Sequence, residues 1–442
     1  MTLTVRLVFL LTFCFGFGTV DAQSVNDHGS AADHHSPEIE CGSHDEYDPA
    51  GVILHHIADA NEFHVVGDFT FPLPVILYAP DHGFTFGLSS MFHHGQTAVD
   101  GYVMNHGRIN RLTDAPADLM EGHHVVECIA HSSTEIDGKT RDVYSALIDG
   151  ERYTLDAPSV GDGGLLGGGI TSFYDLSITK NVFTMLLAAV LLILLWWRVA
   201  RGYKKNAGKA PSGIQSLMEP FFVFLRDEIT IPMIGEKHYE RFQPFIMTIF
   251  FFVLFANLLG LVPIFPGSAN VTGNLAVTMA LAVIAAIVAY VHGNRHYWEH
   301  TLWMPGVPAL IKVFILTPVE ILGLVIKPFS LMVRLFANIT AGHIIILSLI
   351  SLIFIFGNNG ESVIGAGAGA VVAVAFTLFM NCIELLVAFV QAFIFAILSA
   401  SYIGAAVEDA HHHDEAGHHG EEKVAEGGVM GGAVTGMHTA AD

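Results

Sequence analysis

A stripe of polar residues crosses Ile321–Ile350, a long apolar stretch that is typical of a membrane-buried helix. Glu320, Lys327 and Arg334 are spaced by seven residues, so a helix places them on one narrow face, and Asn338 follows one turn after Arg334. A charged side chain at the centre of a bilayer costs at least about 2.5–3.5 kcal/mol, and a guanidinium stays protonated at biological pH. Such a residue is retained where it faces protein or water and acts on a partner there. An ion pair buried between helices is the structural alternative.

A second polar stripe lies in the last apolar segment, where the polar positions fall close to one helical face: Thr377, Asn381, Glu384, Gln391 and Tyr402. Glu384 needs a partner or a water-filled cavity, and His343 on the preceding segment is the best candidate. His343 follows Arg334 by nine residues, on roughly the opposite face of the helix. A fixed positive charge beside groups that gain and lose protons predicts a proton path, and plain packing is the alternative.

The composition indicates a membrane protein with polar ends. The chain is 52% hydrophobic and 14% charged, with a formal net charge of −22, and its mean hydropathy is +0.52. The first third and the last thirty residues are polar and acidic, whereas residues 180–405 are apolar. This distribution argues against a nucleic-acid partner.

The N-terminus is typical of a secretory signal peptide, predicted over residues 1–22. It has Arg6, the apolar run Leu7–Phe17 and the small-x-small sequence Val20–Ala22. An uncleaved membrane anchor is the alternative, although the run is short for a span. Export would place Cys41 and Cys128 in an oxidising compartment, where pairing of the two is an open possibility.

Residues 23–160 are predicted to form a small exported domain that contains β-structure. Phe69–Tyr78 is typical of extended chain interrupted by prolines, and Asp149-Gly150 between two apolar runs predicts a hairpin turn. The many histidines here match no known metal spacing, so we interpret them as solvated surface residues. Residues 161–179, which include the glycine-rich run Gly161–Gly169, are predicted to be a linker.

Residues 180–408 are predicted to be an all-α polytopic membrane domain with about five transmembrane helices and an amphipathic surface helix near residues 214–225. The last two helices are too long for perpendicular spans. The first of them must tilt strongly, bend at Pro328 or end early, and two overlong helices in succession predict a tilted pair. The basic cluster of residues 198–209 predicts a cytoplasmic side after the first span. Because five spans place the two ends of the chain on opposite sides, the tail, residues 409–442, is predicted to be cytoplasmic. The five predicted spans are Val182–Trp197, Phe245–Pro263, Leu275–His292, Pro318–Phe356 and Gly365–Ile403.

Four sequence segments resemble the a subunit of rotary F-type ATP synthases, and together the resemblance covers residues 175–408. The longest segment, Lys327–His343, contains Arg334. The other three are Asn257–Pro263, Asn270–Asn274 and Glu384–Phe395. The resemblance also accounts for the His343 and Glu384 pair, because some family members carry the two residue types in exchanged positions.

The resemblance implies a role for each polar residue. Arg334 would face the carboxylates of a rotating ring of c subunits. Glu384, His343, Asn270, Asn274 and Gln391 would line an outer proton half-channel, and Glu320 would lie nearer an inner one. Lys327 and Asn338 belong to the Arg334 stripe. The implied partners are the c-ring, the b subunits of the peripheral stalk, the F1 sector and membrane lipid, in a bacterial inner membrane. Nucleotide sites would lie on other subunits, and no cofactor or metal is expected.

The alternative from another class is a metal-ion transporter. It depends on the 25 histidines and on the histidine-rich run at residues 411–419. However, the titratable pair predicted within the membrane, His343 and Glu384, offers one histidine and one glutamate as possible ligands, which is too few to surround a metal ion.

Overall fold

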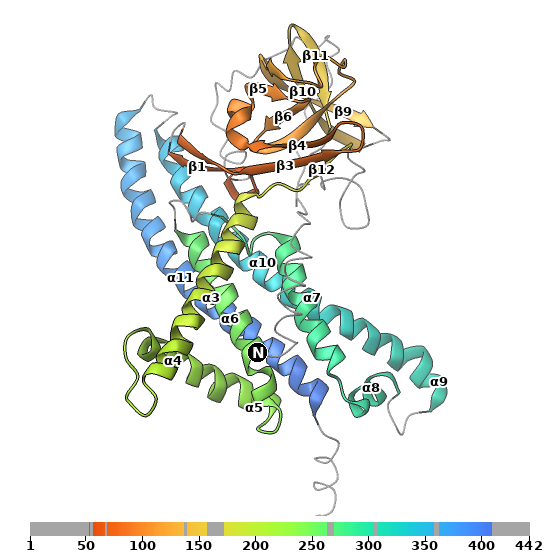
Figure 1. The fold of residues 1–442 in the computed structure, drawn as a ribbon, viewed down its shortest axis with the longest axis vertical. Helices are drawn as coiled ribbons and strands as arrows, with labels where there is room; N and C mark the ends of the chain where they lie inside the picture. The colour runs from red at the N-terminus through yellow and green to blue at the C-terminus, as the bar shows by residue number, and fades with distance from the viewer. Residues whose placement is uncertain are drawn as a thin grey trace, which may run out of the picture.

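A β-domain and a helical membrane domain make up the computed structural model, with the β-domain at one end of the helices (Figure 1). The structure describes residue 53 and residues 56–66, 69–136, 139–156, 172–262, 269–303, 308–357 and 362–408. The predicted signal peptide, the glycine-rich run Gly161–Gly169 and the tail at 409–442 lie outside the described residues.

The β-domain contains three antiparallel sheets. The largest has the strand order β8-β5-β6-β7-β11-β10-β9, a second has the order β12-β3-β4, and β1 pairs with β2. The strands are β1 Glu62–Val66, β2 Phe69–Pro72, β3 Pro74–Ala79, β4 Gly83–Leu88, β5 Thr97–Val99, β6 Tyr102–Asn105, β7 Arg108–Thr113, β8 His123–Val125, β9 Cys128–Ile136, β10 Lys139–Ile148, β11 Glu151–Leu155 and β12 Tyr174–Asp175, with the 3-10 helix η1 Ser89–Gly95 between β4 and β5.

The alternation of side chains along the strands creates two hydrophobic cores. On β6, Tyr102 and Met104 pack with Leu77 of β3. Val103 points to the other face of the strand and packs with Ile148 of β10. The central strand is therefore apolar on both faces, which explains why the sequence shows no simple alternation there.

The predicted hairpin is confirmed. Ile148 of β10 pairs with Glu151 of β11. Asp149 and Gly150, which connect the two strands, have φ of 52° and 76°. Two consecutive residues with positive φ are what a type I′ turn requires.

The β-domain continues beyond residue 160, into the segment predicted to be a linker. Tyr174 pairs with Tyr78 of β3, and Phe173 is fully buried in the domain core. Burial of this large aromatic side chain stabilises the added strand. Cys128 is in a disulfide. Cys41, the partner considered from the sequence, lies outside the described residues.

The membrane domain is helical, as predicted. Within the described ranges, four helices are long and apolar enough to cross a membrane, and a fifth span is obtained if α7 and α8, which are bent by 107°, count as one. The helices are α3 Lys180–Lys205, α4 Ile214–Phe224, η2 Leu225–Thr230, α5 Ile231–Ile234, α6 Tyr239–Leu261, α7 Leu275–Val291, α8 Arg295–Leu302, α9 Ala309–Ile311, η3 Lys312–Leu316, α10 Thr317–Phe356 and α11 Val363–Val407.

The last two helices are as long as the sequence predicts. α10 continues for 40 residues through Pro328, and α11 has 45 residues. The two helices run obliquely beside each other across the domain (Figure 1). An early end of α10, one of the three ways to fit its length, is therefore excluded, and its tilt in a membrane stays a prediction.

The predicted amphipathic segment forms α4 and η2. Met218 and Leu225 of its apolar stripe are buried against the other helices, whereas Leu217 is 63% exposed. Only part of the stripe is therefore covered by the chain itself. A position on the cytoplasmic membrane surface stays a prediction.

Candidate functional site

The Arg334 stripe lies on an uncovered face of α10. Arg334, Asn338 and Lys327 are exposed and Glu320 is half-buried. Within the described part of the chain, Arg334 forms no hydrogen bond or ion pair. In the continuous helix Lys312–Phe356, which includes α10, only 11% of an apolar 18-residue stretch is buried, against 61% of such a stretch in α6. This face is therefore open to another protein or to lipid, and no ion pair buried among the described residues accounts for Arg334.

Glu384 and His343 meet where α10 and α11 cross. The His343 Nε2 atom lies 3.9 Å from the Glu384 Oε1 atom. The Glu384 residue is 3% exposed, and neither carboxylate oxygen has a hydrogen-bond partner among the described residues. A Cβ atom at Gly342 would lie 2.8 Å from the Glu384 Oε1 atom. The glycine before His343 therefore makes room for the carboxylate.

These two residues line a cavity of about 550 Å³. Asn270 lies on the same wall, is 5% exposed, and leaves both of its side-chain amide atoms without a partner in the described region. Thr377 and Asn381 of the α11 stripe also line the cavity. Unsatisfied polar groups in a roomy cavity are typical of a site that holds water.

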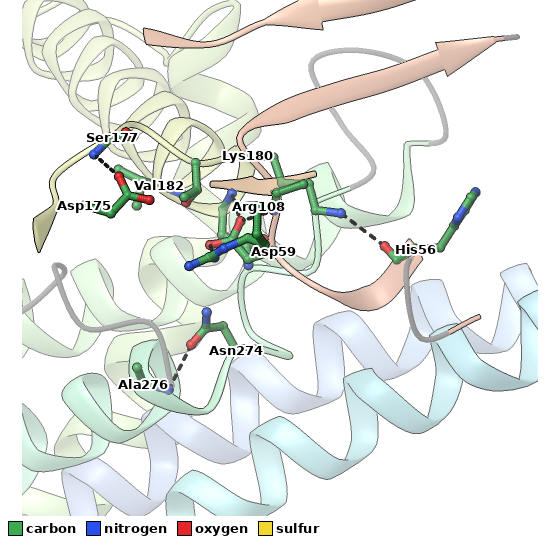
Figure 2. A network of polar contacts seen from close by, with 12 residues as sticks. His56, Asp59, Arg108, Asp175, Ser177, Lys180, Val182, Asn274 and Ala276 are labelled. Carbon is green, nitrogen blue, oxygen red and sulfur yellow. Dashed lines mark hydrogen bonds and ion pairs between the residues drawn. The ribbon is translucent and has the colours of Figure 1, made fainter. Parts of the chain in front are cut away.

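Two residues predicted for the same path lie elsewhere. The Asn274 Oδ1 atom accepts a hydrogen bond from the Ala276 backbone N–H at 2.9 Å, so Asn274 is the N-cap of α7 (Figure 2). Gln391 is buried on α11 and is not among the residues that line the cavity. The structure therefore brings Asn270, His343 and Glu384 together and leaves the other two apart.

Several cavity residues were missed from the sequence. Glu62, His56 and Lys180 line the cavity, and the first two come from the β-domain. Glu62 is a single acidic residue in a polar segment, so the sequence gives no indication that it lines a cavity. Asn257, within one of the family-like segments, accepts a hydrogen bond from the Thr272 hydroxyl at 2.5 Å and donates to the Ala388 carbonyl at 3.4 Å. It connects α6 to the loop before α7 and to α11.

A metal site does not appear in the part of the chain that the structure describes. No group of three or more histidine, cysteine, aspartate or glutamate residues there could hold a metal ion. The histidine-rich tail, on which the transporter alternative depends, lies outside that part.

Two family models match different parts of the chain. The model described as ATP synthase A chain matches residues 182–404. A second model, described as a domain of unknown function (DUF8433), matches residues 52–137.

Similar curated proteins have one common name. ATP synthase subunit a of Chloroherpeton thalassium is 40% identical over 64% of this chain and 81% of its own length. ATP synthase subunit a of Myxococcus xanthus is 44% identical over 55% of this chain and 77% of its own length. ATP synthase subunit a of Anaeromyxobacter dehalogenans is 40% identical over 60% of this chain and 66% of its own length. The chain therefore belongs to the a-subunit family, the F0 membrane component of F-type ATP synthases.

Proposed function

We propose that this a subunit conducts protons by holding Arg334 against the carboxylates of a rotating c-ring, with the cavity around Glu384 and His343 as the outer half-channel. The observation that carries the proposal is Arg334, which is exposed on a helix that its own chain barely covers. A charge at membrane depth needs a partner. A carboxylate on a neighbouring subunit supplies one.

The order of residues along α10 supports two separate half-channels. His343 lies at the end of α10 that reaches the cavity, and the β-domain forms part of that cavity. At a rise of 1.5 Å per residue, Arg334 lies roughly 13 Å further along the helix and Glu320 about 21 Å beyond Arg334. With the β-domain on the outer side of a bacterial inner membrane, His343 serves the outer half-channel and Glu320 the inner one.

The mechanism follows from the cost of charge in lipid. A protonated carboxyl on the c-ring can face lipid, whereas an ionised one cannot. Arg334 stabilises the ionised form only at this interface, and its fixed charge blocks a direct proton leak between the half-channels. Each proton that crosses releases about 2.3 kcal/mol per 100 mV. The ring converts this energy into rotation, and the b subunits and the F1 sector would be the other partners.

Removal of the guanidinium tests the proposal. Arg334→Ala is expected to abolish ATP-driven proton pumping in inverted vesicles, while the complex stays assembled in the membrane. Arg334→Lys should fail or nearly fail, because an ammonium lacks the planar fork of donors. Arg295→Ala is the matched control, since Arg295 is exposed and pairs with Glu299 on α8. Normal pumping by Arg334→Ala vesicles would refute the mechanism.

A further inference from the structure

The cavity that contains Glu384 has a wall built by the β-domain. The β-domain supplies six lining residues, at 56, 57, 60, 62, 63 and 107. All six lie within the match to the domain of unknown function and outside the match to the ATP synthase A chain. The β-domain is therefore part of the site that the family residues form.

Buried polar contacts fix this wall to the first membrane helix (Figure 2). The Asp59 Oδ1 atom accepts a hydrogen bond from the Asn181 backbone N–H at 3.1 Å, in the first turn of α3. The Arg108 Nη1 atom lies 3.9 Å from the Asp59 Oδ2 atom. The Lys180 Nζ atom donates a hydrogen bond to the His56 carbonyl at 3.2 Å. Burial raises the pKa of Asp59, and the charges of Arg108 and Lys180 act against that rise.

A pair of titratable side chains extends from this wall to the surface. The His94 Nδ1 atom lies 3.3 Å from the Glu62 Oε1 atom, and the His94 side chain is 48% exposed whereas that of Glu62 is 13% exposed. Glu62 lines the cavity. The pair therefore connects solvent to the interior in which Glu384 and His343 lie.

We propose that Glu62 and His94 are the proton-collecting entrance of the outer half-channel. A proton from water or buffer binds His94 and passes to Glu62. It then crosses the cavity to His343 and Glu384. Each group releases the proton that it gained, so its protonation state is unchanged after each transfer. The cavity has room for many water molecules, each of which occupies ~30 Å³ in the liquid. The inference depends on the proposed function, because it extends the same path outward.

The charges around Glu62 favour this role. The residues that line the cavity include two acids, Glu62 and Glu384, and one base, Lys180, together with His56 and His343. The positive charges of Arg108 and Lys180 have the Asp59 carboxylate close by. A cleft lined by negative charge raises the local concentration of cations, and histidine exchanges protons near neutral pH.

Passive proton conduction by F1-stripped vesicles tests the proposal. Glu62→Gln and His94→Asn should slow conduction driven from the outer side at about pH 8, above the usual range of histidine titration. The loss should be roughly tenfold, the low end of the rate gain that a charged cleft provides. The loss should shrink at about pH 6, where protons are plentiful, and added imidazole buffer should restore conduction. His124→Asn is the control, because the His124 Nε2 atom lies within hydrogen-bond distance of two backbone carbonyls of its own domain, those of Asp118 and Glu121, and His124 does not line the cavity.

The outcomes separate this inference from the proposed function. Normal conduction in Glu62→Gln and His94→Asn, with conduction lost in Glu384→Gln, would overturn the entrance and leave the half-channel intact. Normal conduction in Glu384→Gln would overturn the half-channel itself. An equal loss at every pH that imidazole does not restore would mean that the wall is structural, which also overturns the entrance. If Glu62→Gln does not assemble, the half-exposed His94→Asn still decides the question.

Discussion

At the scale of single residues, the two helices α10 and α11 separate a fixed charge from a titratable pair. Arg334 is exposed on the uncovered face of α10, whereas Glu384 is buried within 3.9 Å of His343. The sequence places Arg334 and His343 on different helical faces, and the structure confirms that they have different surroundings. The sequence also named His343 as the best candidate partner of Glu384, and the packing of α10 against α11 decides that the two side chains meet.

An exchange of the pair tests whether the two residues act together. Glu384→Gln should slow proton transfer from the outer side, because the amide cannot carry a proton through the site. His343→Glu combined with Glu384→His should recover more ATP-driven pumping than the two single losses together allow, because contacting residues couple. Strictly additive defects in this double-mutant cycle would show that the two residues do not share a path.

A small substitution beside Glu384 tests the geometry of the site. Gly342→Ala should displace the Glu384 carboxylate, since the new Cβ atom would lie 2.8 Å from Oε1. The side chain can move, so assembly should be retained, but conduction should fall by up to ~100-fold if the shift reaches about 1 Å. Gly323→Ala is the control on the same helix, because a Cβ atom there meets nothing within 4 Å. Equal conduction by the two variants would mean that the position of the carboxylate is not critical.

At the scale of elements, small residues allow α11 to pack closely on its neighbours. Ala388, Ala392, Ala396 and Ala400 recur every four residues and are fully buried, as in close helix packing in membranes. Gly404 continues the series against α5, where a Cβ atom would lie 1.7 Å from the Met233 carbonyl oxygen. The alanine face of α11 is therefore packed closely against the other helices. The face of α10 that carries Arg334 is exposed.

The contact at Gly404 gives a stability prediction. Gly404→Ala should destabilise the membrane domain by about 1–3 kcal/mol, because the clash is with backbone that must shift. Thermal unfolding of the purified complex in detergent should show the loss as a lower midpoint. Gly367→Ala, in open space on the same helix, should unfold at the original midpoint. A midpoint for Gly404→Ala that matches this control would show that α5 moves freely away from α11.

At the scale of the whole molecule, the number of spans decides which sides the two ends occupy. The part of the chain that the structure describes has four candidate spans, or five if α7 and α8 form one. α3 leaves the β-domain, and α11 ends at the opposite end of the helical domain (Figure 1). This arrangement supports five crossings, with α7 as the third.

Protease accessibility tests the topology. Protease added to intact spheroplasts should cut the β-domain and spare the tail at residues 409–442, and inverted vesicles should give the reverse. The expected result follows from an odd number of spans together with the basic cluster at residues 198–209. Cleavage of both ends from one side would mean that α7 does not cross the membrane, and the half-channel assignments would then be wrong.

The sequence alone determined which side chains share one helical face, because helical periodicity is local. It therefore predicted the Arg334 stripe, the long last helices, the hairpin at Asp149-Gly150 and the family. For contacts between distant segments it offered one candidate, the pair of His343 and Glu384, because such contacts depend on how side chains pack across helices. Only the tertiary structure decided that Asn270 joins Glu384 while Asn274 caps α7. It also decided that the β-domain forms a wall of the cavity, because polar contacts buried between distant segments fix its position.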